Sequence, residues 1–271
     1  MKLSEAIGIL QDAGIDSARH DARTIFEAVG KIEKSRLMFS DAECDLPAIA
    51  LAVKRRANRE PLQYILGEVD FYRESYSVNK NCLIPRADTE ILVDYAIRSI
   101  PAGRRFIDVC TGSGCVAIST LKNTEETCAV AVDISPGALA VAMENADKNS
   151  VSERIDFLCA DALNTAAPGN FFAVLSNPPY VSESAYENLE PEIYFEPKIA
   201  FVGGVTGLDF YERIITLYID KIEDGGFFAF EIGFDQAEAL LDLAFSYNMS
   251  CEIIKDYSGN DRVAVLKKPL P

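Results

Sequence analysis

The chain has 271 residues, of which 49% are hydrophobic and 25% are charged, and these proportions exclude a disordered chain, a collagen and a coiled-coil rod. Its formal net charge of −16 lies wholly after residue 87, because residues 1–87 carry 13 basic and 13 acidic side chains and the remainder carries 13 and 29. Such an acidic surface repels phosphate backbones, so direct contact with nucleic acid is not expected. No apolar run of about 18 residues occurs, so neither a membrane span nor a membrane partner is predicted.

Cysteine and histidine usage narrows the chemistry. The seven cysteines are odd in number and include no C-x-x-C pair, which argues against a disulfide framework or a zinc site. His20 is the only histidine, so a Ser-His-Asp triad or a multi-histidine metal site has almost nothing to be built from. The first residues lack the apolar stretch of a secretory leader, and we therefore expect reduced thiols in the cytoplasm.

The first part of the chain is predicted to be helical. Leu3, Ile7 and Leu10 share one helical face, and the same spacing recurs over residues 22–29 and 46–57. A basic group (Lys54, Arg55, Arg56 and Arg59) ends the third pattern. It either complements the helix dipole or contacts an acidic or RNA-associated partner.

The later elements alternate between strand and helix patterns. Residues 68–80 predict a short β-hairpin that turns at 73–75. Strands are expected over 106–110, 129–133, 155–158, 171–175 and 226–232, helices over 88–100, 116–121, 136–149, 209–222 and 237–245, and a closing antiparallel hairpin over 253–266. This alternation predicts a doubly wound parallel sheet, in which ligands bind beyond the carboxyl ends of the strands.

The first informative turn is the glycine-rich segment Asp108–Gly114, DVCTGSG, which leads from a strand into a helix. Glycines let the backbone pass close to a ligand, and the amides at the start of the helix face it. The next strand ends at Asp133, whose carboxylate can accept both hydrogen bonds of a ribose diol. The two features together predict an adenosine-containing cofactor but do not separate NAD from S-adenosylmethionine (SAM).

The decisive turn is Ser176–Tyr180, SNPPY, after the fourth strand. Two consecutive prolines cannot continue a ladder or open an ordinary helix, so they predict a stiff loop. The side-chain oxygen of Asn177 and the backbone oxygen of Pro178 then form a pair of acceptors that suits one planar NH₂ group. Tyr180 supplies a flat face on which a planar substrate can stack.

With the glycine-rich turn and the ribose acid, Asn-Pro-Pro-Tyr resembles class I SAM-dependent methyltransferases that act on planar amino or amide nitrogens. Further segments are similar to those of the peptide chain release factor glutamine methyltransferase family. These are Arg59–Gly67, Leu83–Glu90, Glu196-Pro197, Gly207–Tyr211, Glu231–Gly233 and Asp261–Val263. The resemblance covers nearly the whole chain.

The resemblance implies an α/β fold: a seven-stranded, mostly parallel, doubly wound (Rossmann-like) SAM methyltransferase sheet with a small helical N-terminal domain and a connecting β-hairpin. Residues 1–67 would recognise the substrate, 68–87 would form the hairpin linker, and 88–271 would be catalytic. The implied reaction transfers a methyl group from SAM to the side-chain amide nitrogen (N5) of the Gly-Gly-Gln glutamine of release factors, in the cytoplasm.

Site residues are carried over in two sets. The cofactor would be bound by Asp108, Cys110, Thr111, Gly112, Ser113, Gly114, Asp133, Ile134, Asp161, Ala162 and Asn177, and the substrate would be handled by Asn177, Pro178, Pro179 and Tyr180. The alternatives are a ribosomal-protein glutamine N5-methyltransferase, an adenine-N6 methyltransferase on nucleic acid, and a non-catalytic binding module with the same fold.

The hypothesis for the reaction needs no strong base. The oxygens of Asn177 and Pro178 accept the two amide protons and aim the nitrogen at the methyl group, so that transfer is a direct displacement that depends on positioning. One departure from the family pattern is Cys110, where the family usually has glycine. If that position needs a positive φ, cysteine is strained there.

Overall fold

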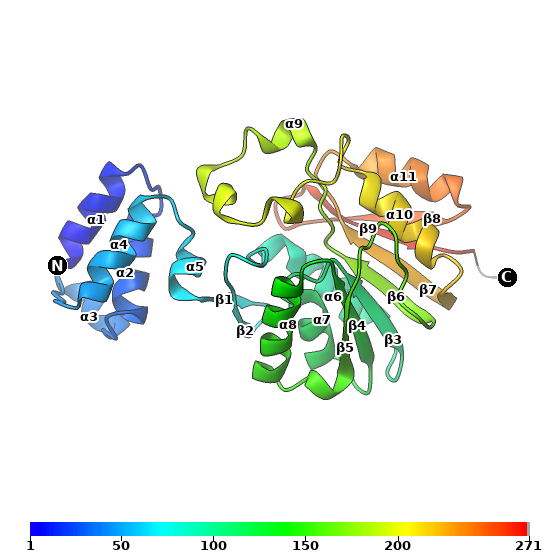
Figure 1. Ribbon diagram of the computed structural model, residues 1–271, viewed down its shortest axis with the longest axis horizontal. Coiled ribbons are helices and arrows are strands. Elements are labelled where there is room, and N and C mark those ends of the chain that lie inside the picture. The colour runs from blue at the N-terminus through cyan, green and yellow to red at the C-terminus, as the bar shows by residue number, and fades with distance from the viewer. Residues whose placement is uncertain (270–271) are drawn as a thin grey trace. The chain divides into compact units, whose positions relative to one another are not determined.

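A computed structural model describes residues 1–269. The chain divides into two compact units (Figure 1). The first contains Met1–Glu68 together with the short segment Glu190–Phe195, and the second contains Val69–Leu189 together with the chain from Glu196 onward. The division therefore assigns a piece of the loop that follows the Asn-Pro-Pro-Tyr segment to the first unit.

The first unit is a small helical bundle. Its helices are α1 (Leu3–Asp12), α2 (Ala18–Ala28), α3 (Lys34–Phe39), α4 (Pro47–Ala57), α5 (Leu62–Leu66) and the 3₁₀ turn η3 (Pro191–Phe195). The predicted apolar faces are confirmed, because Leu3 and Leu10 of α1 are buried against Ile25 and Phe26 of α2 and Ile49 of α4. Helices of this length are only marginally stable on their own in water, so this packing supplies most of their stability.

The basic group at the end of α4 is not the open cationic surface that a docking role requires. Arg56 is only 7% exposed and pairs with Asp21 at 2.7 Å and with Glu192 at 3.1 Å. Arg59 also reaches Glu192, at 3.2 Å. Both arginines thus bind Glu192, which explains why Glu190–Phe195 belongs to this unit. Arg56 and Arg59 therefore form their ion pairs inside the first unit.

The second unit is built on a seven-stranded sheet with the order β5-β4-β3-β6-β7-β9-β8. The strands are β3 (Arg105–Val109), β4 (Cys128–Asp133), β5 (Ile155–Cys159), β6 (Phe171–Ser176), β7 (Ile222–Glu231), β8 (Ser250–Lys255) and β9 (Asp261–Lys267). Neighbours pair in parallel except that β9 runs antiparallel to both β7 and β8. The predicted fold class is confirmed.

Helices cover both faces of this sheet (Figure 1). The helices of this unit are α6 (Glu90–Ser99), α7 (Cys115–Lys122), α8 (Pro136–Lys148), α9 (Glu183–Tyr186), α10 (Asp209–Tyr218) and α11 (Ala237–Ser246), and its 3₁₀ turns are η1 (Ala87–Thr89), η2 (Ser152–Arg154) and η4 (Lys198–Ala200). Successive strand residues enter opposite cores: Phe106 packs with α6 and α7, whereas Ile107 packs with α10 and α11. Among the helices of residues 1–269, none combines the length and apolarity that a membrane crossing requires.

A separate hairpin, β1 (Glu68–Phe71) and β2 (Glu74–Ser77), precedes the sheet. Its turn lies at Tyr72 and Arg73, with φ of 53° and 95°, and not at 73–75 as predicted. Phe71 and Tyr76 are buried in the core of the second unit, so the hairpin is part of the packing of that unit.

Strand β7 begins four residues earlier than predicted, and α10 correspondingly ends at Tyr218 and not at residue 222. Ile222 pairs with Phe171, and the register then shifts before Ala173 pairs with Phe227. The two glycines at 225–226 hid this pairing in the sequence, because glycine normally signals the end of a strand pattern.

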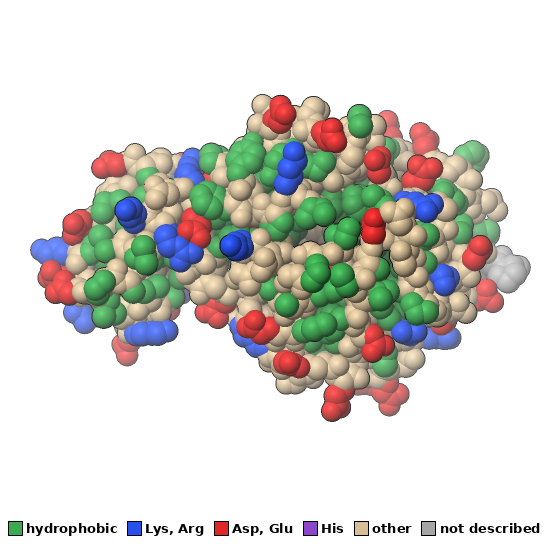
Figure 2. All heavy atoms as spheres, in the orientation of Figure 1, with side chains coloured by type: hydrophobic (Ala, Val, Ile, Leu, Met, Phe, Trp, Pro, Cys, Tyr) green, Lys and Arg blue, Asp and Glu red, His purple; other side chains and the backbone are tan. Residues whose placement is uncertain are grey.

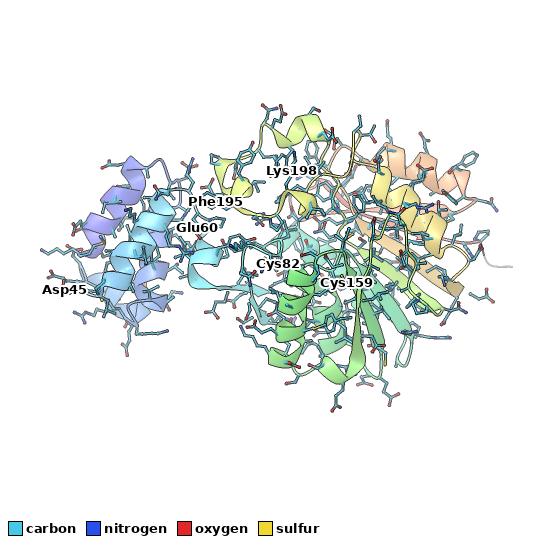
Figure 3. All side chains as sticks on the ribbon, viewed as in Figure 1. Asp45, Glu60, Cys82, Cys159, Phe195 and Lys198 are labelled. Atoms are coloured by element: carbon cyan, nitrogen blue, oxygen red, sulfur yellow. The ribbon has the colours of Figure 1, made fainter. Side chains whose placement is uncertain are left out.

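The cysteines of the described chain differ in their exposure to solvent, and its charged side chains are of both signs. Among the cysteines, Cys82 is buried and Cys159 is exposed (Figure 3). On the visible face of the second unit, acidic side chains are spread among apolar and neutral ones, and lysine and arginine form no continuous stripe there (Figure 2).

Candidate active site

A cavity of about 380 Å³ opens at the carboxyl ends of β3, β4, β5 and β6, where ligands bind in open α/β sheets. Its walls include Cys110 and Gly112 after β3, Asp133 at the end of β4, Asp161 after β5 and Asn177 after β6. Ile134, Ala162 and Pro179 also line it. The three turns singled out in the sequence therefore converge on one space.

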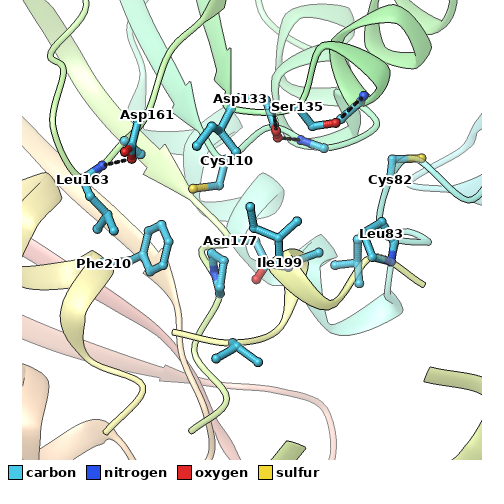
Figure 4. A pocket seen from close by; sticks show the side chains of 18 of the residues that line it. Cys82, Leu83, Cys110, Asp133, Ser135, Asp161, Leu163, Asn177, Ile199 and Phe210 are labelled. Carbon is cyan, nitrogen blue, oxygen red and sulfur yellow. Dashed lines mark hydrogen bonds between the residues drawn. The ribbon is translucent and has the colours of Figure 1, made fainter. Parts of the chain in front are cut away.

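The turn after β3 is shaped by a strained cysteine. Cys110 has φ of 62°, in the left-handed region that favours glycine, so the anticipated strain at this position is confirmed. Its side chain projects toward the cavity (Figure 4). Gly114, by contrast, precedes α7 with φ of 82° and lies outside the cavity walls described here.

Asp108 lies near the end of β3, just before the same turn. It is 1% exposed, and its Oδ2 accepts hydrogen bonds from the Thr111 hydroxyl at 2.6 Å and the Ala117 amide at 3.2 Å. Its Oδ1 has no partner among the described residues. Burial raises the pKa of Asp108 to about 7, although those two hydrogen bonds oppose the rise. Asp108, Thr111 and Ser113 border a second cavity of about 30 Å³ that also touches Asn177.

Asp133 is held in place by the backbone on both sides of it. Its two oxygens accept hydrogen bonds from the Gly112 amide and the Ser135 amide, each at 2.9 Å. Burial raises its pKa, and these amides oppose the shift. Each carboxylate oxygen still has a lone pair available, so Asp133 can accept the two hydrogen bonds of a ribose diol.

The part of the cavity wall that contains Leu163 and Phe210 is more apolar. Asp161 accepts hydrogen bonds from the Leu163 amide at 2.8 Å and the Asn164 side chain at 2.6 Å. Figure 4 shows Leu163 and Phe210 beside it, facing the space between Cys110 and Asn177. An apolar wall next to polar turns suits a planar heterocycle with a polar edge.

Asn177 stands where three cavities meet: it borders the cavities of about 380 Å³ and 30 Å³ and a third of about 50 Å³. Its Nδ2 donates a hydrogen bond to the Thr89 hydroxyl at 3.1 Å. Tyr180 lines the third cavity and donates its hydroxyl to Glu231 Oε1 at 3.3 Å. Pro178 is buried and forms no part of these three walls, so its proposed acceptor role stays a prediction.

The backbone that follows Asn-Pro-Pro-Tyr is held by hydrogen bonds with residues 201–203 and with Gln236. The Val181 amide donates to the Phe201 carbonyl at 2.8 Å, and the Gly203 amide donates to the Val181 carbonyl at 2.9 Å. The Gln236 side chain donates to the Tyr180 carbonyl at 3.0 Å. A Cβ on Gly203 would collide with the Pro179 carbonyl, so only glycine permits the close approach.

Comparison with known proteins identifies the family. Residues 2–67 match the model of the PrmC N-terminal domain, and residues 87–193 match that of the methyltransferase small domain. The chain is 35% identical to the release factor glutamine methyltransferase of Caulobacter vibrioides over 96% of this chain and 93% of that one. It is 37% identical to the enzyme of the same name from Thermodesulfovibrio yellowstonii, over 92% of each chain. The chain belongs to the release factor glutamine methyltransferase family.

A solved structure agrees with the fold of this family member. The ribosomal protein L11 methylase from Lactobacillus delbrueckii subsp. bulgaricus superposes with a TM-score of 0.53, covering 70% of this chain and 83% of that one at 18% identity. Identity this low supports the shared methyltransferase fold alone.

Several wall residues of this family member were missed in the sequence. Leu83 comes from the segment after the hairpin, Ile199 from η4, and Phe210 from α10. Leu83 and Phe210 lie in segments that carried the family resemblance, but nothing in their periodicity marked them as facing a ligand. Only the return of distant segments to one edge of the sheet brings them to the cavity.

Proposed function

We propose that this chain transfers a methyl group from SAM to the N5 nitrogen of the Gly-Gly-Gln glutamine of peptide chain release factors, in the cytoplasm. One observation carries the proposal: Asn177 borders both a large cofactor-sized cavity and a small cavity walled by Tyr180. The family names the reaction, and the two adjoining cavities support placing the cofactor in the larger one and the substrate glutamine in the smaller one.

The residues of the large cavity fit SAM. Asp133 offers its carboxylate to the ribose hydroxyls, and Leu163 and Phe210 flank the space for the adenine. Asp108 borders the adjoining cavity of about 30 Å³, and its unpaired, buried Oδ1 is an acceptor that the ammonium group of the methionine part can satisfy. When bound, SAM supplies an electrophilic methyl group on a sulfonium.

The substrate amide is positioned by the chain itself. An amide nitrogen is a weak nucleophile because its lone pair is delocalised into the carbonyl. Asn177 Oδ1 and the Pro178 carbonyl oxygen accept its two hydrogens, which fixes the direction of the nitrogen lone pair. Tyr180 forms one wall of the small cavity. As the N–CH₃ bond forms and the S–CH₃ bond breaks, the sulfur keeps the electron pair, and the nitrogen then releases one proton to solvent. The fixed dipoles of the two acceptors therefore provide the rate enhancement without a general base.

A transfer assay with labelled SAM tests this function. Purified release factor, RNA and DNA are offered separately to the wild-type protein. We expect label in the release factor alone. Label in either nucleic acid and none in the release factor would overturn the proposal.

A further inference from the structure

Three segments that carried the family resemblance meet around one side chain, that of Gln236. They are Ser176–Tyr180, Gly207–Tyr211 and Glu231–Gly233, the last of which has no role in the reaction as described so far. Gln236 stands directly before α11 and is only 9% exposed. Four hydrogen bonds join its carboxamide to these three segments.

The carboxamide of Gln236 can take only one orientation. Its Oε1 accepts a hydrogen bond from the Gly233 amide at 2.9 Å, and a backbone amide can only donate. Its Nε2 donates to the carbonyl of Tyr180 at 3.0 Å and to that of Gly207 at 3.4 Å, and a carbonyl can only accept. A flipped carboxamide would lose all three bonds, so its donor side is committed to the Asn-Pro-Pro-Tyr loop.

Tyr211 of α10 supports the oxygen side of the carboxamide. The residue is fully buried, and its hydroxyl lies 3.1 Å from Gln236 Oε1 and 3.0 Å from the carbonyl oxygen of Glu231 in β7. Because both of these neighbours are acceptors, the hydroxyl acts as the donor. The groups that fix Gln236 therefore belong to the interior of the second unit.

Tyr180 is held at both of its ends. At the backbone, Gly207 approaches so closely that a Cβ there would collide with the Tyr180 carbonyl oxygen. The φ of Gly207 is 80°, so glycine alone meets both conditions. At the other end, the Tyr180 hydroxyl donates to Glu231 Oε1 at 3.3 Å. Gln236 thus completes a set of contacts that leaves Tyr180 little freedom to move.

We propose that Gln236 is a positioning residue for the methyl transfer. Through the Tyr180 carbonyl it fixes a residue that walls the small cavity, which Asn177 also lines. Gln236 is not among the described residues that line the three cavities at Asn177, so it acts through the loop and touches neither reactant. The inference rests on the proposed function and names the residue that keeps the wall of its substrate cavity in place.

Two variants of the full-length protein test the proposal. Gln236→Met keeps the length of the side chain and removes all four hydrogen bonds. Gln236→Asn keeps a carboxamide that can cap α11, but it is one methylene group too short to reach Gly233 and Tyr180 together. We expect both variants to lower kcat for release factor roughly 10- to 100-fold, with the Kd for SAM within about threefold of wild type. Wild-type kcat in Gln236→Asn would show that only the cap matters and would overturn the proposal.

Asn149 provides a matched control for the loss of a buried carboxamide. It is 7% exposed, and its Nδ2 also donates to two backbone carbonyls, those of Ser75 at 3.3 Å and Asn145 at 3.0 Å. Asn149→Leu removes these bonds far along the chain from the Asn-Pro-Pro-Tyr loop. We expect it to lower stability and to leave kcat unchanged. A fall in kcat equal to that of Gln236→Met would reduce the effect to general destabilisation and would contradict the inference.

A measurement without turnover keeps the inference distinct from the proposed function. In protein labelled with 3-fluorotyrosine, the ¹⁹F signal of Tyr180 is identified by its absence in Tyr180→Phe. We expect this signal to shift in Gln236→Met and Gln236→Asn and to stay in place in Asn149→Leu. An unchanged signal in both Gln236 variants would overturn the inference. If the wild type methylates no release factor but the signal responds as expected, the proposed function fails and the positioning of Tyr180 by Gln236 stands.

Discussion

At the scale of single residues, Cys110 shows how a turn can keep its shape with an unfavourable residue. Its φ of 62° places it where an L side chain is disfavoured by roughly 1–2 kcal/mol. The partly buried side chain packs against the core that contains α10 and α11, and this burial offsets part of that strain. The turn therefore tolerates cysteine because the cysteine side chain is small and is not branched at Cβ.

Valine at position 110 is expected to be much worse than cysteine or glycine. It is close to cysteine in volume, but its branched Cβ is strongly disfavoured at positive φ. We expect Cys110→Val to lower the free energy of unfolding by about 2 kcal/mol relative to Cys110→Gly, as measured by urea denaturation. Equal stabilities for the two variants would show that the turn relaxes away from positive φ.

Asp133 combines a structural and a binding role. Its oxygens accept the Gly112 and Ser135 amides and are proposed to bind the cofactor ribose. Two charge-assisted hydrogen bonds of about 1.5–3 kcal/mol each are at stake. We expect Asp133→Ala to raise the calorimetric Kd for SAM at least about 100-fold and Asp133→Asn, which keeps one oxygen, to raise it less. An unchanged Kd in Asp133→Ala would place the ribose elsewhere.

At the scale of elements, the sequence predicted the sheet well because its strands are buried on both faces. Such strands appear as short, continuous apolar runs bounded by turn residues, as in β3, β4 and β6. The prediction was wrong where a local sequence pattern, glycine as the end of a strand, was overridden by pairing with a distant strand. Strand β7 continues past Gly225 and Gly226 because Ile222 pairs with Phe171, and no local pattern reports that pairing.

The site residues also fall into two groups, those that the sequence predicted and those that it did not. Asp133 and Asn177 were predictable because they follow strands whose carboxyl ends share one edge of the sheet. Thr89 and Ile199 were not, since the 3₁₀ turns η1 and η4 that carry them reach the site only through packing. Sequence motifs marked some of these segments without indicating what their side chains do.

The close contact between Gly203 and the Asn-Pro-Pro-Tyr loop predicts the effect of a substitution at Gly203. Gly203→Ala would press a methyl group on the Pro179 carbonyl and shift the loop. We expect kcat to fall at least about tenfold and stability to drop by about 1–3 kcal/mol, the range for overpacking. Gly8→Ala in α1 is the control, because nothing lies near its Cβ position, and it should raise stability by about 0.5–1 kcal/mol. Wild-type turnover in Gly203→Ala would show that the loop does not need this approach.

At the scale of the whole molecule, recognition of a protein substrate needs more surface than one glutamine pocket provides. The basic group of α4 is a poor candidate, because Arg55 pairs with Glu60 and Arg56 with Asp21 in the interior of the first unit. Removing Arg56 would leave a buried carboxylate unpaired, so such variants report folding and not docking. Deletion of residues 1–80 would also remove Phe71 and Tyr76 from the core of the second unit.

Exposed apolar side chains of the first unit are better candidates for substrate docking. Phe39, at the end of α3, is 86% exposed, and aromatic residues of this kind dominate binding energy at interfaces. We expect Phe39→Ser to raise KM for intact release factor roughly tenfold, about 1.4 kcal/mol, without changing the Kd for SAM. Phe245→Ser in the second unit is the control, since Phe245 is 85% exposed. Equal KM changes in both variants would remove the distinction between the two surfaces.

The central claim is that the Asn177 carboxamide acts on the Gly-Gly-Gln glutamine of a release factor. Mass spectrometry of a release factor co-expressed with this protein tests it most directly, because it reports both the residue modified and the number of methyl groups. Wild-type protein should add one methyl group to that glutamine, and Asn177→Ala, which should still bind SAM, should leave it unmodified. A glutamine unmodified by the wild type, or methylated as fully by Asn177→Ala, would contradict the account.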